Sequence, residues 1–297
     1  MKITIGVPVM NLHELTMEFL DLIFKNTNQI DEILLVDNGS QPHILEYIYQ
    51  NRYKYFRSGK IATIRNIQNV GVRESLNQIQ KTAHGDIICY THNDVDFLEK
   101  GWDDKIREAF KKYPDAGIIG AYGAKGLAVP DIYQTPYEFT QLIRAENVSD
   151  CPMDKEVHGF RNIHGAFENV TMFDGFMFCI KKKLLDEIGG FNGKVLESHH
   201  MYDAFICIES LKKGYDNIVI PLGLYHQGGA TDVSQDWASV FGKSKQQVHQ
   251  DAHPLFYEYG RGILPVLVED IYNEEENKII GYNLYMNRQL VKTKMYE

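Results

Sequence analysis

Two aspartates separated by one residue give the clearest indication of chemistry in this chain. Asp94 and Asp96 follow residues 87–90, an apolar run typical of a buried strand. Side chains two residues apart on an extended chain face the same side, so both carboxylates can meet one ligand. Carboxylate oxygens suit Mg²⁺ and Mn²⁺, which also accept phosphate oxygens as ligands. The pair therefore predicts a divalent-cation site; the alternative is two solvated acids in a turn.

Polar residues also follow two earlier apolar runs. Residues 3–9 lead into Asn11, and residues 32–36 lead into a turn sequence that begins with Asp37. In open α/β sheets, ligands bind at the carboxyl ends of the strands. The three clusters are therefore expected to lie together at one edge of a sheet and to form a binding site there.

The elements that must position these clusters alternate between strand and helix. From residue 3 to residue 121, short β-branched runs alternate with amphipathic helical patterns, which is typical of parallel βαβ units. Strands are predicted over residues 3–9, 32–36, 61–65, 86–91 and 116–121, and helices over residues 15–26, 43–53, 73–82 and 100–112.

The rest of the chain is less regular. Residues 122–164 are polar and rich in Gly and Pro, which predicts a functional loop or lid. A strand is predicted over residues 169–180, helices over 181–188 and 202–213, and short strands over 218–221 and 224–226. Residues 278–286 and 289–295 flank a charged turn and fit either a hairpin or helices. We expect an α/β domain over residues 1–230 and an extension over residues 231–297 that packs on it or mediates homo-oligomerisation.

Composition narrows the function classes. The net charge of −9 argues against broad nucleic-acid binding, which requires clustered Lys and Arg. The one dense basic run, residues 181–183, is interpreted as a solvated helix start. The four cysteines are widely spaced, as expected in a reducing compartment. No run approaches the roughly 20 apolar residues of a membrane span, and no signal peptide is evident. A soluble, cytoplasmic protein is therefore expected.

Taken in order, these motifs resemble those of the GT-A glycosyltransferases, especially the large, mostly inverting family that uses nucleotide-sugar donors and an Asp-x-Asp motif. The resemblance covers roughly residues 1–230 and implies a Rossmann-like, mostly parallel sheet flanked by helices. It is carried by GVPVMN (6–11), ILLVDNGS (33–40), NVG (69–71), Asn77, GDII (85–88), DVD (94–96), FDG (173–175), IGGF (188–191), YDAFIC (202–207), KGY (213–215) and YH (225–226).

The resemblance implies a donor site in which Asp37 hydrogen-bonds the base, usually uracil, unless it only forms the turn before Asn-Gly. Asp94 would face the ribose and the metal, and Asp96 would be the main protein ligand of Mn²⁺ or Mg²⁺. His226 would be a further metal ligand; the alternative is a structural histidine. The implied donor-binding residues are Pro8, Val9, Asn11, Asp37, Arg73, Asp94, Asp174 and Gly175.

Asp203 matches the acid that acts as general base in inverting members, where a carboxylate takes the acceptor's proton. This chain departs from the pattern nearby: Tyr202 replaces the acid that usually precedes, and Glu209 stands where Arg is common. The alternative for Asp203 is a favourable charge at a helix N-terminus.

The predicted function is a metal-dependent glycosyltransferase of the hexosyl-transferring type. It would move a sugar from a nucleoside-diphosphate donor, usually UDP-linked, to a hydroxyl of a glycan or another acceptor. One alternative is a non-catalytic carbohydrate- or nucleotide-sugar-binding protein on the same fold. The other, a sugar-nucleotide pyrophosphorylase, is disfavoured because residues 10–14 lack a Gly-rich basic phosphate loop.

Overall fold

The computed structural model describes residues 1–127, 144–149, 161–193, 195, 201–228 and 242–296. An eight-stranded sheet at its centre has the order β3-β2-β1-β4-β11-β6-β12-β9. Its neighbours pair in parallel except at β11, which is antiparallel to β4 and β6, and at β9. The expected α/β class with a mostly parallel central sheet is thus confirmed. The strands are β1 (Ile3–Val9), β2 (Glu32–Asn38), β3 (Ile61–Asn66), β4 (Ile87–Thr91), β6 (Ala116–Gly120), β9 (Glu168–Asn169), β11 (Met177–Lys181) and β12 (Asp216–Val219).

Helices cover both faces of this sheet, because successive residues of a strand point to opposite sides. On β2, Leu34 is buried in one core cluster with Ile79 of α4, whereas Leu35 is buried in a second cluster with Phe19 of α1. The first cluster also includes residues of α7 and α8, and the second includes residues of α5. The helices are α1 (His13–Asn26), α2 (Pro42–Asn51), α3 (Tyr53–Phe56), α4 (Val72–Thr82), α5 (Trp102–Lys112), α7 (Lys182–Ile188), α8 (Tyr202–Lys212) and α11 (Lys245–Gly260).

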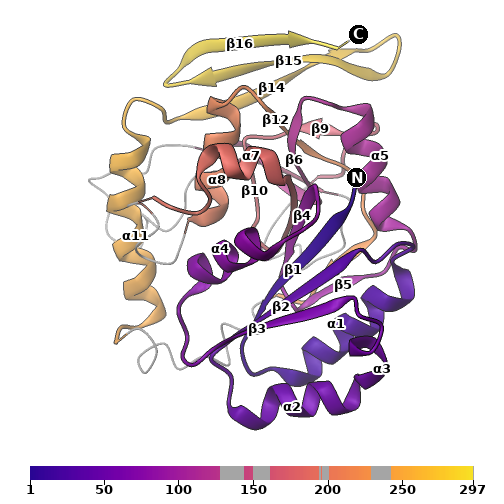
Figure 1. Ribbon diagram of the computed structural model, residues 1–297. Coiled ribbons are helices and arrows are strands. Elements are labelled where there is room, and N and C mark those ends of the chain that lie inside the picture. Colours follow the sequence, from indigo (N-terminus) through magenta and orange to yellow (C-terminus); the bar gives the residue numbers. More distant parts are fainter. Residues whose placement is uncertain (128–143, 150–160, 194, 196–200, 229–241, 297) are drawn as a thin grey trace.

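A second sheet has six strands, of which β14, β15 and β16 lie at the opposite end of the molecule from α1, α2 and α3 (Figure 1). It has the order β10-β7-β14-β15-β16, with β8 paired to β7. Because β14 pairs with β7, the C-terminal strands extend a sheet that begins in the predicted catalytic domain. Its strands are β7 (Tyr122–Leu127), β8 (Arg144–Ser149), β10 (Met172–Phe173), β14 (Val266–Asn273), β15 (Lys278–Met286) and β16 (Gln289–Met295).

Two expectations from the sequence are corrected by the observed strands. The segment predicted as a loop or lid contributes β7 and β8, and β7 is buried along its whole length. Residues 128–143 and 150–160 of that segment lie outside the described residues. The expected single strand over residues 169–180 is three short strands, because turns separate β9, β10 and β11.

The C-terminal segments form a hairpin, which settles the choice that the sequence left open. Asn287 and Arg288 join β15 to β16 with φ values of 49° and 62°, the conformation that two-residue hairpin turns require. On the inner face, Lys294 pairs with buried Asp216 at 2.6 Å, and the Tyr282 hydroxyl donates to Asp216 at 2.6 Å. The extension is therefore fixed to the central sheet. The domain boundary at residue 230 falls among residues outside the described ranges, and oligomerisation stays a prediction.

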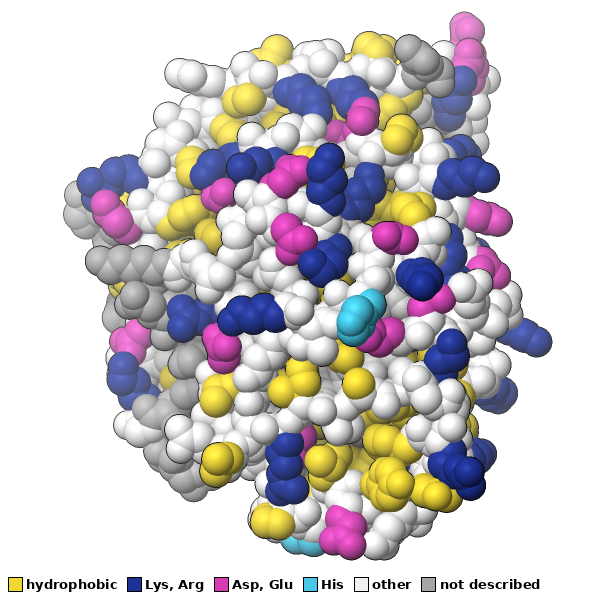
Figure 2. Space-filling view, viewed as in Figure 1, with side chains coloured by type: hydrophobic (Ala, Val, Ile, Leu, Met, Phe, Trp, Pro, Cys, Tyr) yellow, Lys and Arg dark blue, Asp and Glu magenta, His cyan; other side chains and the backbone are white. Residues whose placement is uncertain are grey.

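The visible surface carries both signs of charge. Figure 2 shows Lys and Arg side chains intermixed with Asp and Glu over this face. The basic run begins α7 as interpreted from the sequence, with Lys182 paired to Asp186 at 2.9 Å and Lys183 to Glu187 at 3.8 Å. Across the described ranges, each helix is too short or too polar to cross a membrane.

Candidate active site

Three side chains able to hold a metal ion converge just beyond the carboxyl end of β4. One ligand atom from each of His92, Asp94 and His226 lies within 4.8 Å of the others. Asp94 Oδ1 is 3.7 Å from Nδ1 of His92 and 3.6 Å from Nε2 of His226. Among the described residues this buried oxygen has no hydrogen-bond partner. A desolvated carboxylate oxygen between two imidazoles is costly unless it meets a cation or a donor, so the group fits a metal ion.

A turn and a small two-stranded sheet bring these three residues together. After β4, the chain turns at residues 93 and 94 and enters β5 (Val95–Phe97). This strand pairs antiparallel with β13 (Leu224–His226), which places His226 opposite Val95. The His226 ring stacks on Phe176, with ring centroids 4.5 Å apart and 14° between the planes. Pairing and stacking together hold His226 beside Asp94.

The two imidazoles also decide the charge of Asp94. Burial disfavours the carboxylate and by itself raises the pKa of Asp94. The imidazoles of His226 and His92, whose nearest nitrogens lie 3.6 and 3.7 Å from Asp94 Oδ1, outweigh burial, so the pKa of Asp94 lies below its ordinary value. Asp94 is therefore ionised at neutral pH, as a metal ligand must be.

Asp96 lies outside this group. It sits within β5, and its Oδ1 accepts a hydrogen bond from Gln227 Nε2 at 3.0 Å. The spacing rule for an extended chain does not hold here, because Asp94 belongs to the turn before the strand. His92, which the sequence analysis passed over, completes the group instead. It precedes Asp94 by two residues, so the spacing applied to Asp94 and Asp96 was equally present one step earlier.

Asp37 provides a second buried carboxylate, at the carboxyl end of β2. Its Oδ1 accepts a hydrogen bond from the Ser40 amide at 2.9 Å. Its Oδ2 has no hydrogen-bond partner among the described residues and lies 3.4 Å from Nε of Arg65. Asp37 is 1% exposed, so this oxygen is a desolvated acceptor able to take an N–H donor from a ligand.

The end of β1 is tied to the same turn. The Asn11 amide donates to the Ser40 hydroxyl at 2.7 Å, and its side-chain Oδ1 accepts from the Gln41 amide at 3.1 Å. Asn11 adopts a left-handed φ of 53°, which turns the chain sharply after the strand. Pro8 and Val9 pair with the last residues of β2. The structure thus brings these three predicted residues beside Asp37.

The other residues predicted to bind the nucleotide-sugar donor lie on separate elements of the fold. Arg73 is half-buried in the first turn of α4, which packs against β1 and β2. Asp174 and Gly175 form the turn between β10 and β11, where Asp174 Oδ1 accepts from the Phe176 amide at 3.3 Å. A side chain at Gly175 has no room, because its Cβ would lie 2.3 Å from the Tyr202 hydroxyl.

The start of α8 lies against the metal group. The Tyr202 hydroxyl is 3.3 Å from Nε2 of His92. Asp203 follows in the first turn, and its Oδ1 accepts a hydrogen bond from the Ala204 amide at 2.8 Å. That contact is what a favourable charge at a helix N-terminus makes. The base role of Asp203 therefore stays a prediction.

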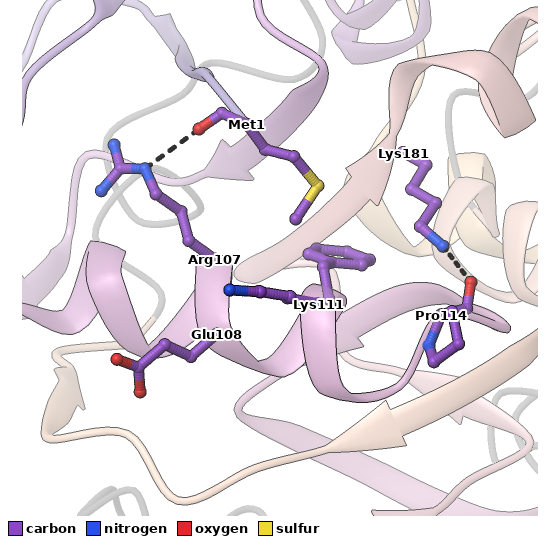
Figure 3. Close-up of a pocket in the computed structure, with 7 residues that line it drawn as sticks. Met1, Arg107, Glu108, Lys111, Pro114 and Lys181 are labelled. Carbon is purple, nitrogen blue, oxygen red and sulfur yellow. Dashed lines mark hydrogen bonds between the residues drawn. The ribbon is translucent and has the colours of Figure 1, made fainter.

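A separate hollow of about 460 Å³ lies at the amino-terminal end of β1, at the far end of that strand from Asn11. Arg107 and Lys181 line it, but both are engaged: Arg107 donates to the Met1 carbonyl at 3.1 Å, and Lys181 donates to the Pro114 carbonyl (Figure 3). This hollow is therefore not the candidate active site.

Sequence comparison with known families gives one match. The profile of a family described as Glycosyl transferase family 2 matches residues 4–189. A search of curated proteins gave no significant match.

Solved structures of similar fold include the following three. The mannosyltransferase PcManGT from Pyrobaculum calidifontis, in complex with GDP-Man and Mn²⁺, superposes with a TM-score of 0.52 at 17% identity, over 87% of this chain and 70% of that chain. GalNAc-T7 with UDP, GalNAc and Mn²⁺ gives 0.57 at 14% identity, over 76% of this chain and 44% of that one. TarS 1-349 of S. aureus in complex with UDP gives 0.51 at 15% identity, over 76% and 60%. This chain thus spans less than half of the GalNAc-T7 chain, and at these identities the likeness shows the GT-A fold.

Proposed function

The chain belongs to glycosyl transferase family 2, and from this premise we propose that it transfers a sugar from a UDP-sugar to an acceptor hydroxyl with the help of a divalent cation. The observation that carries the proposal is Asp94 Oδ1, a buried oxygen without a hydrogen-bond partner among the described residues, flanked by two imidazoles.

The cation would be held by His92, Asp94 and His226. Two nitrogen ligands and one oxygen favour Mn²⁺ over Mg²⁺, because Mg²⁺ prefers an all-oxygen octahedral shell. Two of the similar structures, PcManGT and GalNAc-T7, contain Mn²⁺. When bound, the cation would neutralise charge that grows on the leaving diphosphate.

Asp37 would select the base. Its Oδ1 is occupied by the Ser40 amide, which leaves Oδ2 to accept one N–H. Uracil offers a single imide N–H on its pairing edge, whereas guanine offers two adjacent donors. One available acceptor oxygen therefore suits UDP, the nucleotide bound in the TarS and GalNAc-T7 structures.

The remaining residues would orient donor and acceptor. We propose that Pro8, Val9 and Asn11 wall the base pocket, since they lie beside Asp37 at the strand ends. Arg73 would approach the diphosphate from the start of α4. The turn formed by Asp174 and Gly175 would lie beside the sugar or the acceptor.

Asp203 would act as general base. It would take the proton of the acceptor hydroxyl while that oxygen attacks the anomeric carbon and the C–O bond to the diphosphate breaks. A single displacement of this kind inverts the anomeric configuration. Support comes from its place in the first turn of α8, one residue after the tyrosine that contacts His92.

Calorimetry and a donor panel test the proposal. We expect UDP to bind the wild-type protein with Mn²⁺ and to bind poorly in excess chelator. Asp94→Asn should weaken Mn²⁺ binding by at least about 100-fold, since it removes the charged ligand. Asp251→Asn, which changes a surface acid on α11, is the matched control. In a panel of UDP- and GDP-sugars, we expect a UDP-sugar to be the donor that is hydrolysed. We expect this hydrolysis to require the metal.

Other outcomes would decide against parts of the proposal. Undiminished hydrolysis of the UDP-sugar in excess chelator would show that the divalent cation has no role in the reaction. Tight, metal-dependent binding of UDP-sugars, with neither hydrolysis nor transfer to any acceptor tested, would favour the non-catalytic binding protein instead.

A further inference from the structure

We propose that Tyr202 is a positioning residue for the metal centre, whose hydroxyl holds the His92 ring in the tautomer that binds a cation through Nδ1. This inference rests on the proposed metal role of His92, Asp94 and His226. It assigns a function to the tyrosine that stands at the start of α8, where the sequence resemblance leads one to expect an acid.

The two nitrogens of the His92 ring have different neighbours. Nδ1 lies 3.7 Å from Asp94 Oδ1, on the side of the metal group, whereas Nε2 lies 3.3 Å from the Tyr202 hydroxyl. That hydroxyl in turn donates to the Gly175 carbonyl at 3.4 Å. A hydroxyl whose proton is used in this way can only accept from His92. The chain of contacts therefore places the imidazole proton on Nε2 and leaves the Nδ1 lone pair for the cation.

The His92 ring is more exposed than the His226 ring, so a hydrogen bond to its outer nitrogen has more to contribute to its orientation. Its side chain is 40% exposed, whereas that of His226 is 8% exposed and stacks on Phe176. A neutral histidine with its proton on Nδ1 could not bind a metal through that nitrogen. A hydrogen bond to the other ring nitrogen is the usual means of fixing the tautomer and orientation of a metal-binding histidine.

Several features of the fold place the Tyr202 hydroxyl. Met201, which is buried, adopts a left-handed φ of 66° and directs the first residue of α8. A non-glycine residue in this conformation is strained, and the surrounding structure must offset that strain. The absence of a side chain at Gly175 gives the hydroxyl its space, and Phe191 contacts the tyrosine ring edge-on with centroids 6.4 Å apart.

Nitrogen-15 NMR of the histidine rings in the metal-free wild-type protein tests the tautomer directly. We expect the neutral His92 ring to carry its proton on Nε2. In Tyr202→Phe, which removes only the hydroxyl, the ring should become a mixture of tautomers. A wild-type ring with its proton on Nδ1 would overturn the proposal, whatever the variants do.

Mn²⁺ affinity, measured by electron paramagnetic resonance without donor, tests the consequence. Tyr202→Phe should lower affinity by about 10- to 100-fold, the usual effect of losing a partner of a ligating histidine. Tyr225→Phe is the matched control, because Tyr225 is exposed and adjoins His226 in sequence. Gly175→Ala should give a similar loss, since its Cβ displaces the hydroxyl.

A double-mutant cycle separates positioning from a general structural role. In a His92→Ala background, Tyr202→Phe should have no further effect on Mn²⁺ affinity, because the group it orients is gone. An equal loss with and without His92 would overturn the proposal, as would wild-type affinity in Tyr202→Phe. A wild-type protein that binds no Mn²⁺ would instead refute the proposed metal role itself.

Discussion

Glu168 on β9 offers a quantitative test of how firmly the two sheets are joined. Its carboxylate accepts two hydrogen bonds from Arg161, at 2.6 and 2.8 Å, and one from the His164 amide at 2.6 Å. It also pairs with Lys125 of β7 at 2.8 Å, and Lys125 in turn contacts Asp270 of β14. Burial opposes ionisation of Glu168, but these partners outweigh it and lower its pKa from 4.5 to about 2.

That shift corresponds to about 3 kcal/mol of folding free energy. Because the folded-state pKa is depressed, the contribution is present above pH 4.5 and is lost as the pH falls towards about 2. We therefore expect Glu168→Gln to lower the free energy of unfolding at pH 7 by about 3 kcal/mol. At pH 3 the difference between variant and wild type should be clearly smaller.

Urea denaturation followed by intrinsic fluorescence, at pH 7 and pH 3, measures both quantities. Burial raises the pKa of Asp270 and the charge of Glu168 adds to that shift, so the contribution of Asp270 has the opposite sign and is smaller in the variant. Glu187→Gln is the control: its 3.8 Å pair with Lys183 is exposed, so the loss should stay below about 0.5 kcal/mol. The reasoning is refuted if Glu168→Gln matches wild type at pH 7 and the two pH dependences run parallel.

Three further predictions concern the active site. Asp203→Asn should keep UDP affinity and cut the transfer rate by roughly 10²–10⁴-fold; an unchanged rate, or a product that NMR shows to retain the donor's anomeric configuration, would remove the base role. Asp37→Asn should weaken UDP binding by about 10- to 100-fold in calorimetry, with Mn²⁺ affinity unchanged; equal UDP affinity would show that Oδ2 contacts no base. Asp96→Asn should leave Mn²⁺ affinity unchanged; a loss of Mn²⁺ affinity as large as that in Asp94→Asn would show that Asp96 is a metal ligand.

The first half of the fold was predictable because its signals are local. The alternation of apolar runs and amphipathic patterns predicted β1 over residues 3–9 and placed α1, α4 and α5 within two residues of their observed starts. The second sheet was not predictable in this way. The two strands that join its N-terminal and C-terminal parts, β7 and β14, are separated by more than a hundred residues in sequence. The sequence around Lys125 is typical of a loop, and its ion pair with Asp270 is evident only in the folded structure. The helix α11 was also missed.

In the candidate active site, too, local patterns predicted some neighbours but not the contacts between segments that are distant in sequence. Strand-end clusters correctly indicated where Asn11 and Asp37 would meet, since parallel strands share an edge. The metal role of Asp96 stays a prediction, but residues 94–96 are not one extended segment, because Asp94 belongs to the turn at residues 93 and 94, where His92 is its neighbour. The sequence shows the same two-residue spacing between His92 and Asp94 as between Asp94 and Asp96, and it does not show which pair comes together. Only the antiparallel pairing of β5 and β13 shows which groups converge.

The ligand set also explains why metal should govern donor binding as well as catalysis. The protein carries a net charge of −9, so a diphosphate meets an unfavourable overall field. Two neutral imidazoles and one carboxylate would leave a bound divalent cation with one net positive charge, whereas two carboxylates would cancel it. Opposite charges in a partly desolvated site attract far more strongly than in water. Under the proposed function, the donor site formed by the described residues would therefore rely mainly on the cation to attract the diphosphate, and chelation should weaken UDP binding strongly even where no chemical step is measured.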